Sequence, residues 1–139
     1  ETAPPPRVLL FHTDRRSPKF AALQTDQTTA WLFYDPALRL QIRVQSTATL
    51  HTSDAVAHEQ WRAMSDAMRA IYRTRHAPGT PIRELPTEPP ALVGDGRDHF
   101  AVVRCVVDSI DWLYLKPDGH RRMRITYQGD QFDATWIAP

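Results

Sequence analysis

The residues best suited to chemistry in this sequence form one short run, Thr13-Asp-Arg-Arg-Ser-Pro-Lys19. Two hydroxyl groups and three cationic side chains fall in a turn that we expect to lead from a strand into a helix. Free backbone N–H groups and the positive end of the helix dipole favour an anion at such a point, and phosphate is the usual guest. The alternative is a solvated loop, because exposed cations often bind nothing.

Motifs for other kinds of chemistry are missing from the sequence. The six histidines are scattered and have no metal-ligand spacing, so we expect no metal site. There is no Gly-x-Ser-x-Gly elbow, no Walker loop and no Gly-x-Gly-x-x-Gly turn. Nucleophilic hydrolysis therefore has no support in the residues.

The segments around the basic run predict how it is positioned. Residues 7–12 are rich in β-formers and predict a strand. Ser17 followed by Pro18 predicts the N-cap and first residue of a short helix that ends at about Gln24. Residues 29–34 predict a second strand. Apolar and polar residues then alternate from Leu38 to Leu50, which predicts a long strand with one face in a core.

The rest of the chain predicts a helix and an antiparallel meander. Residues 54–73 carry an apolar stripe that we attribute to core packing rather than to a cofactor site: Ala57, Trp61, Met64, Met68 and Ile71. Residues 76–98 are rich in proline and glycine and predict a loop within the domain. We expect strands at 100–107, 109–115, 121–128 and 132–137, with turns at 117–119 and 129–130. Many short strands with one or two helices predict a small β-barrel.

The bulk composition indicates a single globular domain. The chain has 139 residues, of which 42% are hydrophobic and 24% charged, and its net charge is +1. That charge argues against a general affinity for nucleic acid or acidic membranes. The one cysteine, Cys105, lies in an apolar run, so we expect a buried thiol. We also expect a cytoplasmic protein without a membrane span or signal peptide.

The basic run and the segments after it resemble the pyridoxamine 5'-phosphate oxidase-like family, most closely the branch described only as FMN-binding. The similarity extends over nearly the whole chain and depends on the order and spacing of short motifs: the basic run, Leu40-Gln-Ile-Arg-Val44, Gln60-Trp-Arg-Ala-Met-Ser-Asp66, the arginines of 121–124, and the end Trp136-Ile-Ala-Pro139. It implies that residues 1–139 form one mainly β domain, an antiparallel FMN-binding split β-barrel. We expect the family's first strand pair to be missing, because the chain starts at Glu1 and Arg7-Val-Leu-Leu10 runs straight into the basic run.

The resemblance also implies an FMN site. Thr13, Ser17 and Lys19 match positions that hold the phosphate, and Arg16 lies beside them. Gln41 matches a glutamine that hydrogen-bonds the flavin ring or the ribityl chain. Three further residues match positions near the flavin, with core packing or a solvated surface as the alternative: Trp61, Ser65 and Arg124. Trp61 and Ser65 would come from the second subunit of a homodimer that binds FMN at its interface.

The function that the resemblance implies is that of an FMN-dependent oxidoreductase, in which the flavin carries out two-electron chemistry with a small-molecule substrate or a nicotinamide. Pyridoxamine phosphate is not the expected substrate. The run His120-Arg-Arg-Met-Arg124 lacks the family's arginine and histidine two residues apart, and Pro18 replaces a basic residue. A non-catalytic flavin carrier or sensor is therefore an alternative. A third possibility is single-stranded nucleic acid binding, which the low net charge disfavours, through these strand arginines: Arg39, Arg43, Arg121, Arg122 and Arg124.

Overall fold

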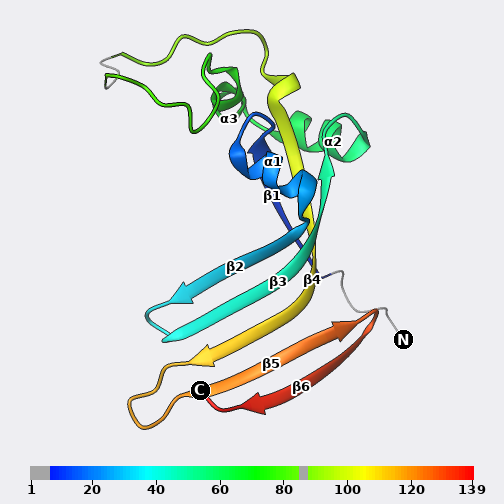
Figure 1. The fold of residues 1–139 in the computed structure, drawn as a ribbon, viewed down its shortest axis with the longest axis vertical. Helices are drawn as coiled ribbons and strands as arrows, with labels where there is room; N and C mark the ends of the chain where they lie inside the picture. Colours follow the sequence, from blue (N-terminus) through cyan, green and yellow to red (C-terminus); the bar gives the residue numbers. More distant parts are fainter. Residues whose placement is uncertain (1–6, 85–87) are drawn as a thin grey trace. The chain divides into compact units, whose positions relative to one another are not determined.

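The computed structural model describes residues 7–84 and 88–139, and its secondary structure is dominated by a six-stranded sheet (Figure 1). The expectation that the family's first strand pair is missing concerns the chain before Arg7, and residues 1–6 lie outside the described part. The strands are β1 (Val8–Asp14), β2 (Thr28–Asp35), β3 (Leu40–His51), β4 (Phe100–Tyr114), β5 (Arg121–Gln128) and β6 (Gln131–Ile137). Their order is β2-β3-β4-β5-β6, and β1 pairs with β4.

The helical elements are short and lie between strands in the sequence. They are α1 (Pro18–Thr25), α2 (Ala55–Ala63), α3 (Asp66–Ala70) and the 3-10 turns η1 (Ile71–Arg73) and η2 (Arg97–His99). Among the described residues, no helix has the length and apolar character that crossing a membrane requires.

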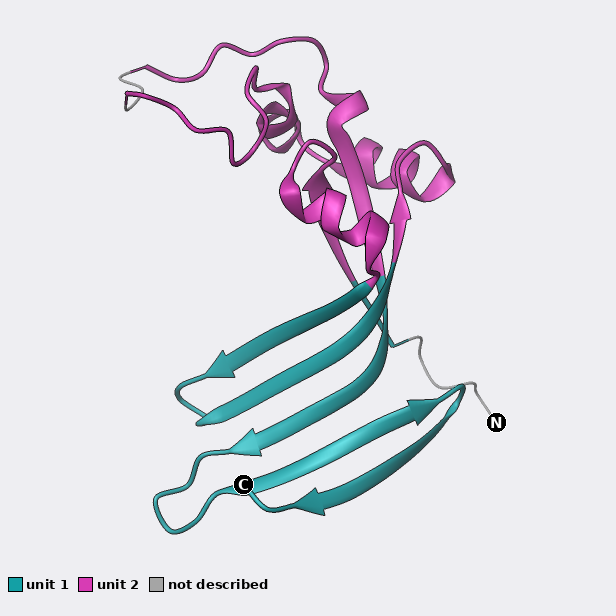
Figure 2. Ribbon diagram, viewed as in Figure 1, with its two compact units in different colours: residues 1–9, 28–48, 105–139 teal, residues 10–27, 49–104 magenta. Residues whose placement is uncertain are grey.

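The chain divides into two compact units, which Figure 2 colours separately. Unit 1 contains residues 28–48 and 105–139 together with the beginning of β1, so it is almost entirely sheet. Unit 2 contains residues 10–27 and 49–104, and therefore all the helices and the first third of β4. Three strands, β1, β3 and β4, contribute residues to both units.

The hairpin of β2 and β3 confirms the predicted alternation. Val44, Ser46 and Ala48 are buried, and the residues between them are exposed. Antiparallel pairing sets Trp31 opposite Val44 and places their side chains on the same face. Ser46 is the polar residue in this buried row, and its hydroxyl is satisfied by Thr29 Oγ1 at 2.6 Å and by Trp31 Nε1, which donates at 3.0 Å.

Strand β4 differs from the prediction, which divided it into 100–107 and 109–115. It is one strand of 15 residues. Asp108, which interrupts the apolar pattern, lies within the strand, and its carboxylate accepts a hydrogen bond of 2.8 Å from the hydroxyl of Thr47. Strand β4 is long enough to pair with three strands, β1, β3 and β5. Strand β5 pairs only with residues 109–114, and the N–H of Val107 donates to the carbonyl of Arg7, directly before β1. Cys105 is fully buried within β4, as predicted.

The predicted helix over 54–73 is also corrected, because it is broken after Ala63. Met64 has an extended backbone (ψ 144°), and the side chain of Ser65 accepts the N–H of Met68, so a new helix starts there. The break turns Met68 and Ile71 away from the core, and they are 51% and 62% exposed. The predicted stripe therefore holds only for its first part.

The core of unit 2 is built around an aromatic cluster. Phe100 is completely buried, and its ring centroid lies 5.2 Å from that of Tyr72, 5.2 Å from that of Trp61 and 5.0 Å from that of His12. Edge-to-face and tilted aromatic contacts of this kind add to the stabilisation that burial provides. Tyr72 is therefore part of the core, where the predicted unbroken stripe placed Met68 and Ile71.

The segment between η1 and η2 agrees with the predicted loop over 76–98, of which residues 85–87 lie outside the described part. Its described residues contain a bridge from Thr74 to Leu92 before η2 begins at Arg97. Gly96 ends the loop with a positive φ of 82°, and a Cβ at this position would lie 2.9 Å from Arg73 Cγ. Only glycine fits this close approach without strain.

Candidate functional site

The corner between β1 and α1 has the local structure that the sequence predicts. Thr13 and Ser17 are buried at 7% and 8% exposure. Ser17 caps α1, because its Oγ accepts the N–H of Phe20 at 3.2 Å, and Pro18 is the first helical residue. The strand end and the cap therefore fix the backbone on both sides of the corner.

The two hydroxyls of the corner face each other. Thr13 Oγ1 and Ser17 Oγ lie 3.3 Å apart, and either can be the donor. Each hydroxyl has one proton, and one of the two protons is used between them. Since Ser17 Oγ already accepts from Phe20, the pair has one O–H left to offer a ligand.

Asp14 and Arg16 form an ion pair inside the corner. Arg16 donates its backbone N–H and Nε to Asp14 Oδ1 at 2.8 and 3.0 Å, and its Nη2 to Oδ2 at 2.7 Å. Its Nη1 also donates to the carbonyl of Thr74 at 2.9 Å. Burial raises the pKa of Asp14, but the hydrogen bonds and positive charge of Arg16 outweigh it, and the pKa lies below its usual value. The carboxylate is therefore ionised and its charge is balanced.

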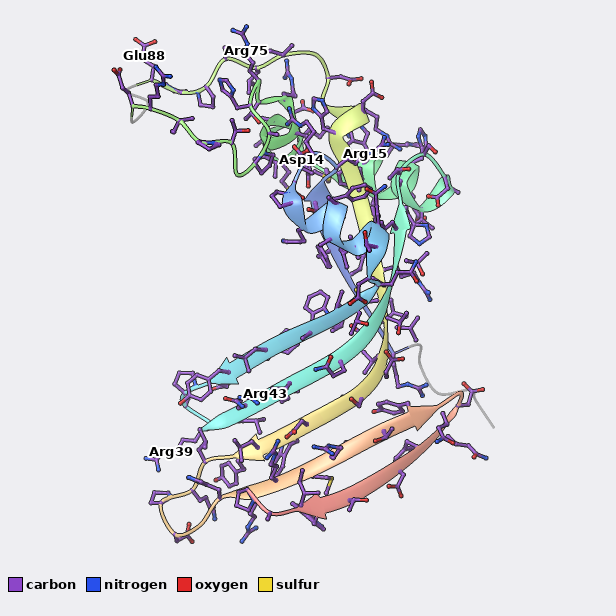
Figure 3. All side chains as sticks on the ribbon, in the orientation of Figure 1. Asp14, Arg15, Arg39, Arg43, Arg75 and Glu88 are labelled. Carbon is purple, nitrogen blue, oxygen red and sulfur yellow. The ribbon has the colours of Figure 1, made fainter. Side chains whose placement is uncertain are left out.

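The remaining cations of the corner are exposed. Arg15 donates its backbone N–H to the carbonyl of His99 and one guanidinium N–H to the carbonyl of Asp98 (Figure 3 labels Asp14 and Arg15). Lys19 has its ammonium 5.3 Å from the ring centroid of Phe11, and within residues 7–84 and 88–139 it forms no ion pair. Lys19 is thus the cation of the corner that can best approach a ligand.

A pocket of about 420 Å³ opens at this corner. Three of the four predicted phosphate residues line it: Thr13, Ser17 and Lys19. Three lining residues come from a later segment of the chain, after α3: Tyr72, Pro78 and Gly79. Arg16 is not among the lining residues, because its guanidinium points to Asp14 and Thr74, and we assign it a positioning role.

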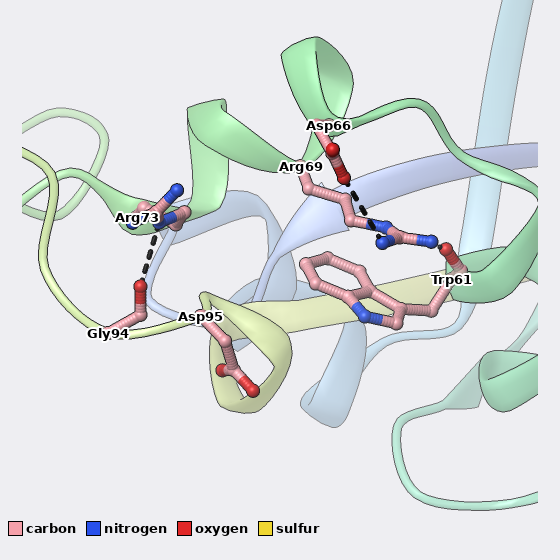
Figure 4. Close-up of a pocket in the computed structure, with 6 residues that line it drawn as sticks. All are labelled: Trp61, Asp66, Arg69, Arg73, Gly94 and Asp95. Carbon is pink, nitrogen blue, oxygen red and sulfur yellow. Dashed lines mark hydrogen bonds and ion pairs between the residues drawn. The ribbon is translucent and has the colours of Figure 1, made fainter.

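Trp61 and Ser65 belong to unit 2 but are absent from the lining of the corner pocket. Ser65 caps α3, and Trp61 packs against the core cluster. Trp61 also lines a second pocket of about 500 Å³, where the guanidinium of Arg69 lies 5.4 Å from its ring centroid (Figure 4). The structure thus gives both residues a packing or capping role.

Gln41 and Arg124 lie in unit 1, on β3 and β5. Gln41 is half-buried and stands opposite Tyr34. Arg124 stands opposite Asp111, whose carboxylate is held by Arg122 at 2.7 Å while Arg124 Nη2 remains at 4.0 Å. The hydrogen bonds from Arg122 lower the pKa of Asp111 below its usual value, and the charges of Arg124 and Arg43 lower it further.

Sequence reasoning missed two residues of the corner. The sequence places Asp14 in a polar turn, where an aspartate commonly accepts the backbone N–H two residues later, as Asp14 does from Arg16. Tyr72 lies off the predicted apolar stripe, and no pattern in the sequence brings it to the corner. Its position follows from the helix break at Ser65.

Comparison with known proteins agrees with the resemblance. Residues 2–52 match the family model described as pyridoxamine 5'-phosphate oxidase, FMN-binding domain. No curated protein sequence matches the chain significantly.

Two solved structures share the fold. A pyridoxamine 5'-phosphate oxidase-related, FMN binding protein from Nostoc punctiforme PCC 73102 matches with a TM-score of 0.75 and 24% identity, over 100% of this chain and 77% of that one. PhzG from Burkholderia lata 383, solved in complex with tetrahydrophenazine-1-carboxylic acid, matches with a TM-score of 0.73 and 19% identity, over 96% and 69%. These similarities confirm the predicted resemblance and the predicted fold, a mostly antiparallel split barrel.

Proposed function

We propose that this chain binds FMN with the cofactor's phosphate in the pocket at the corner of β1 and α1, and that the bound flavin supports an oxidoreductase reaction. The observation that carries the proposal is the gathering of Thr13, Ser17 and Lys19 around one pocket. The match of residues 2–52 to an FMN-binding domain includes the whole corner and supports the same ligand.

The donors of the corner fit a phosphate group. The hydroxyl pair offers one O–H, Lys19 offers its ammonium, and the first turn of α1 adds the positive end of a helix dipole. The ion pair of Asp14 with Arg16 keeps the buried carboxylate from repelling the anion. Bound FMN would supply two-electron redox chemistry, and the chain's part is to hold and orient it.

We propose that Gln41 binds the flavin end of the cofactor, as the resemblance implies. Gln41 can both donate and accept hydrogen bonds through its amide, as the polar edge of a flavin requires. We propose that Arg124 also contacts the cofactor, and that Trp61 and Ser65 of a second copy complete the site in a homodimer. The part of Trp61 that is not covered by the core supports this role, since it lines an open pocket.

Titration of FMN against two lysine variants tests the phosphate site. Lys19→Ala removes a charge-assisted contact to phosphate, which is worth about 1.5–3 kcal/mol, so FMN should bind at least about 10-fold more weakly. Affinity for riboflavin, which has no phosphate, should stay the same. Lys116→Ala is the matched control, because Lys116 also holds its ammonium near an aromatic ring, 5.5 Å from the centroid of Tyr114. Equal FMN affinity in both variants would place Lys19 outside the site.

A separate measurement distinguishes an enzyme from a flavin carrier. The FMN-loaded protein is mixed with reduced nicotinamide cofactors in a stopped-flow instrument, and reoxidation in air is followed. In an oxidoreductase, the bound flavin should be reduced and then reoxidised fast enough to support catalytic turnover. Flavin that stays oxidised with every reductant would favour the carrier or sensor.

A further inference from the structure

Tyr72 is a buried tyrosine whose hydroxyl has no hydrogen-bond partner among the described residues. The residue is 3% exposed, and its ring is fixed by edge-to-face contacts with Phe100 and Trp61, at centroid distances of 5.2 and 5.9 Å. Within the described part of the chain, the only hydrogen bond of Tyr72 outside the secondary structure is accepted by its carbonyl, from His99 Nδ1 at 2.8 Å. Buried phenol groups usually have a partner, so this hydroxyl requires an explanation.

The hydroxyl is not sealed inside the protein. Among the described residues, the enclosed side-chain nitrogen and oxygen atoms that lack a partner are Arg7 Nε and His51 Nε2, and the Tyr72 oxygen is not one of them. Tyr72 lines the corner pocket together with Thr13, Ser17 and Lys19. The small accessible surface of Tyr72 therefore opens into the pocket.

The phenol keeps its proton at neutral pH and can therefore donate a hydrogen bond there. Burial raises the pKa of Tyr72 above its usual value, and the negative charge of Asp14 raises it further, so the proton stays on the oxygen. Among the described residues, Asp14 accepts three hydrogen bonds from Arg16 and none from the Tyr72 hydroxyl. The pocket thus contains a fixed, neutral hydroxyl donor that has no acceptor within residues 7–84 and 88–139.

We propose that Tyr72 is a fourth phosphate-binding residue, whose hydroxyl donates to a phosphate monoester held in the corner by Lys19 and the Thr13–Ser17 hydroxyl pair. The inference rests on the proposed function, because it extends the same pocket. A terminal phosphate has three oxygens that are not in the ester bond. The lysine ammonium, the spare hydroxyl proton and the phenol supply one donor for each.

The Tyr72→Phe variant removes the donor and keeps the ring in the aromatic cluster. We expect about 10-fold weaker binding of FMN, which is a typical effect of losing a hydrogen bond to a charged group. The affinity for inorganic phosphate, titrated directly, should fall to the same degree. Riboflavin affinity should not change, and this separates loss of a phosphate contact from general damage to the pocket. Urea unfolding of the variant reports any change in stability.

Tyr127→Phe is the matched control, because it removes the hydroxyl of a half-buried tyrosine in unit 1. If Tyr72→Phe binds FMN and inorganic phosphate as the unaltered protein does, the inference is overturned and the proposed function stands. If phosphate binds with the expected dependence on Tyr72 but FMN does not bind, the inference stands and the proposed function is wrong. An unaltered protein that binds neither ligand would overturn both.

Discussion

Replacing Arg16 with methionine removes the counter-charge of a buried carboxylate. Asp14 has a side chain that is only 6% exposed, and Arg16 supplies all three of its close donors at 2.7–3.0 Å. Two of these donors belong to the guanidinium and would be lost, together with the bond to the carbonyl of Thr74. Methionine keeps much of the length of the stem, so the effect of the charge dominates.

The expected loss of stability follows from the burial of the pair. Breaking a buried ion pair from one side costs about 3–5 kcal/mol. The Arg16 side chain is 21% exposed, so water can partly replace it, and we expect about 3 kcal/mol at neutral pH, the low end of that range. Arg15→Met is the matched control: its guanidinium makes a single hydrogen bond, 3.3 Å long, to the carbonyl of Asp98. We expect that variant to lie within about 0.5 kcal/mol of the unaltered protein.

The dependence on pH gives a second, independent signature. In the unaltered protein the pKa of Asp14 is below its unfolded value, so the stabilisation is complete above that value and is lost as pH falls through the folded pKa. Without Arg16, burial dominates and the pKa of Asp14 rises above the unfolded value. The folded variant then binds a proton more readily than the unfolded chain, and acid relieves the penalty. The difference in the free energy of unfolding between Arg16→Met and the unaltered protein should therefore become smaller as pH falls from 7 toward 4.

Urea unfolding at several pH values, followed by tryptophan fluorescence, measures both signatures. The reasoning is refuted if Arg16→Met and Arg15→Met unfold with equal free energies at pH 7. The difference in the free energy of unfolding between Arg16→Met and the unaltered protein must also decrease as pH falls. A difference that stays constant or increases would mean that the Asp14 carboxylate is not the origin of the lost stability.

Two further stability predictions follow from the backbone. Gly96→Ala should lose about 1–3 kcal/mol in urea unfolding, because φ is +82° and the new Cβ would approach Tyr72 C to 3.0 Å. Gly94→Ala has open space around its Cβ and should lose less, so equal losses would contradict the steric argument. Asp54→Ala should lose about 1–2 kcal/mol, because Asp54 caps α2 through the N–H of Ala57. Asp54→Asn preserves the cap and should lose less, and a larger loss in Asn than in Ala would count against capping.

The sequence was most informative where a local rule decides the structure. The serine before Pro18 marks the start of α1, and the alternation around Val44 marks the buried face of β3. Both signals depend only on neighbouring residues, which is why they could be interpreted without knowing the fold. The placement of the basic run at a strand–helix corner followed from the same signals.

Prediction failed where a contact distant in sequence decides the structure. The polar Asp108 separates the two strands predicted at 100–107 and 109–115, but in the structure a hydroxyl on β3 donates to its carboxylate and β4 continues through it. The apolar stripe over 54–73 was extended through Ser65, whose side chain instead caps a new helix. In the candidate site, the same spacing rules could not show that Arg16 turns inward to Asp14, or that a later tyrosine joins the pocket.

The burial of Cys105 gives this chain an intrinsic probe of its own opening. The thiol is the single one in the sequence and has no exposed surface, near the middle of a 15-residue strand. A thiol reagent can react only when β4 separates from its neighbours, so the labelling rate reports that event rather than the fraying of an end. Occupancy of the corner pocket by any ligand that stabilises the folded chain should slow the labelling, without a chromophore on the ligand.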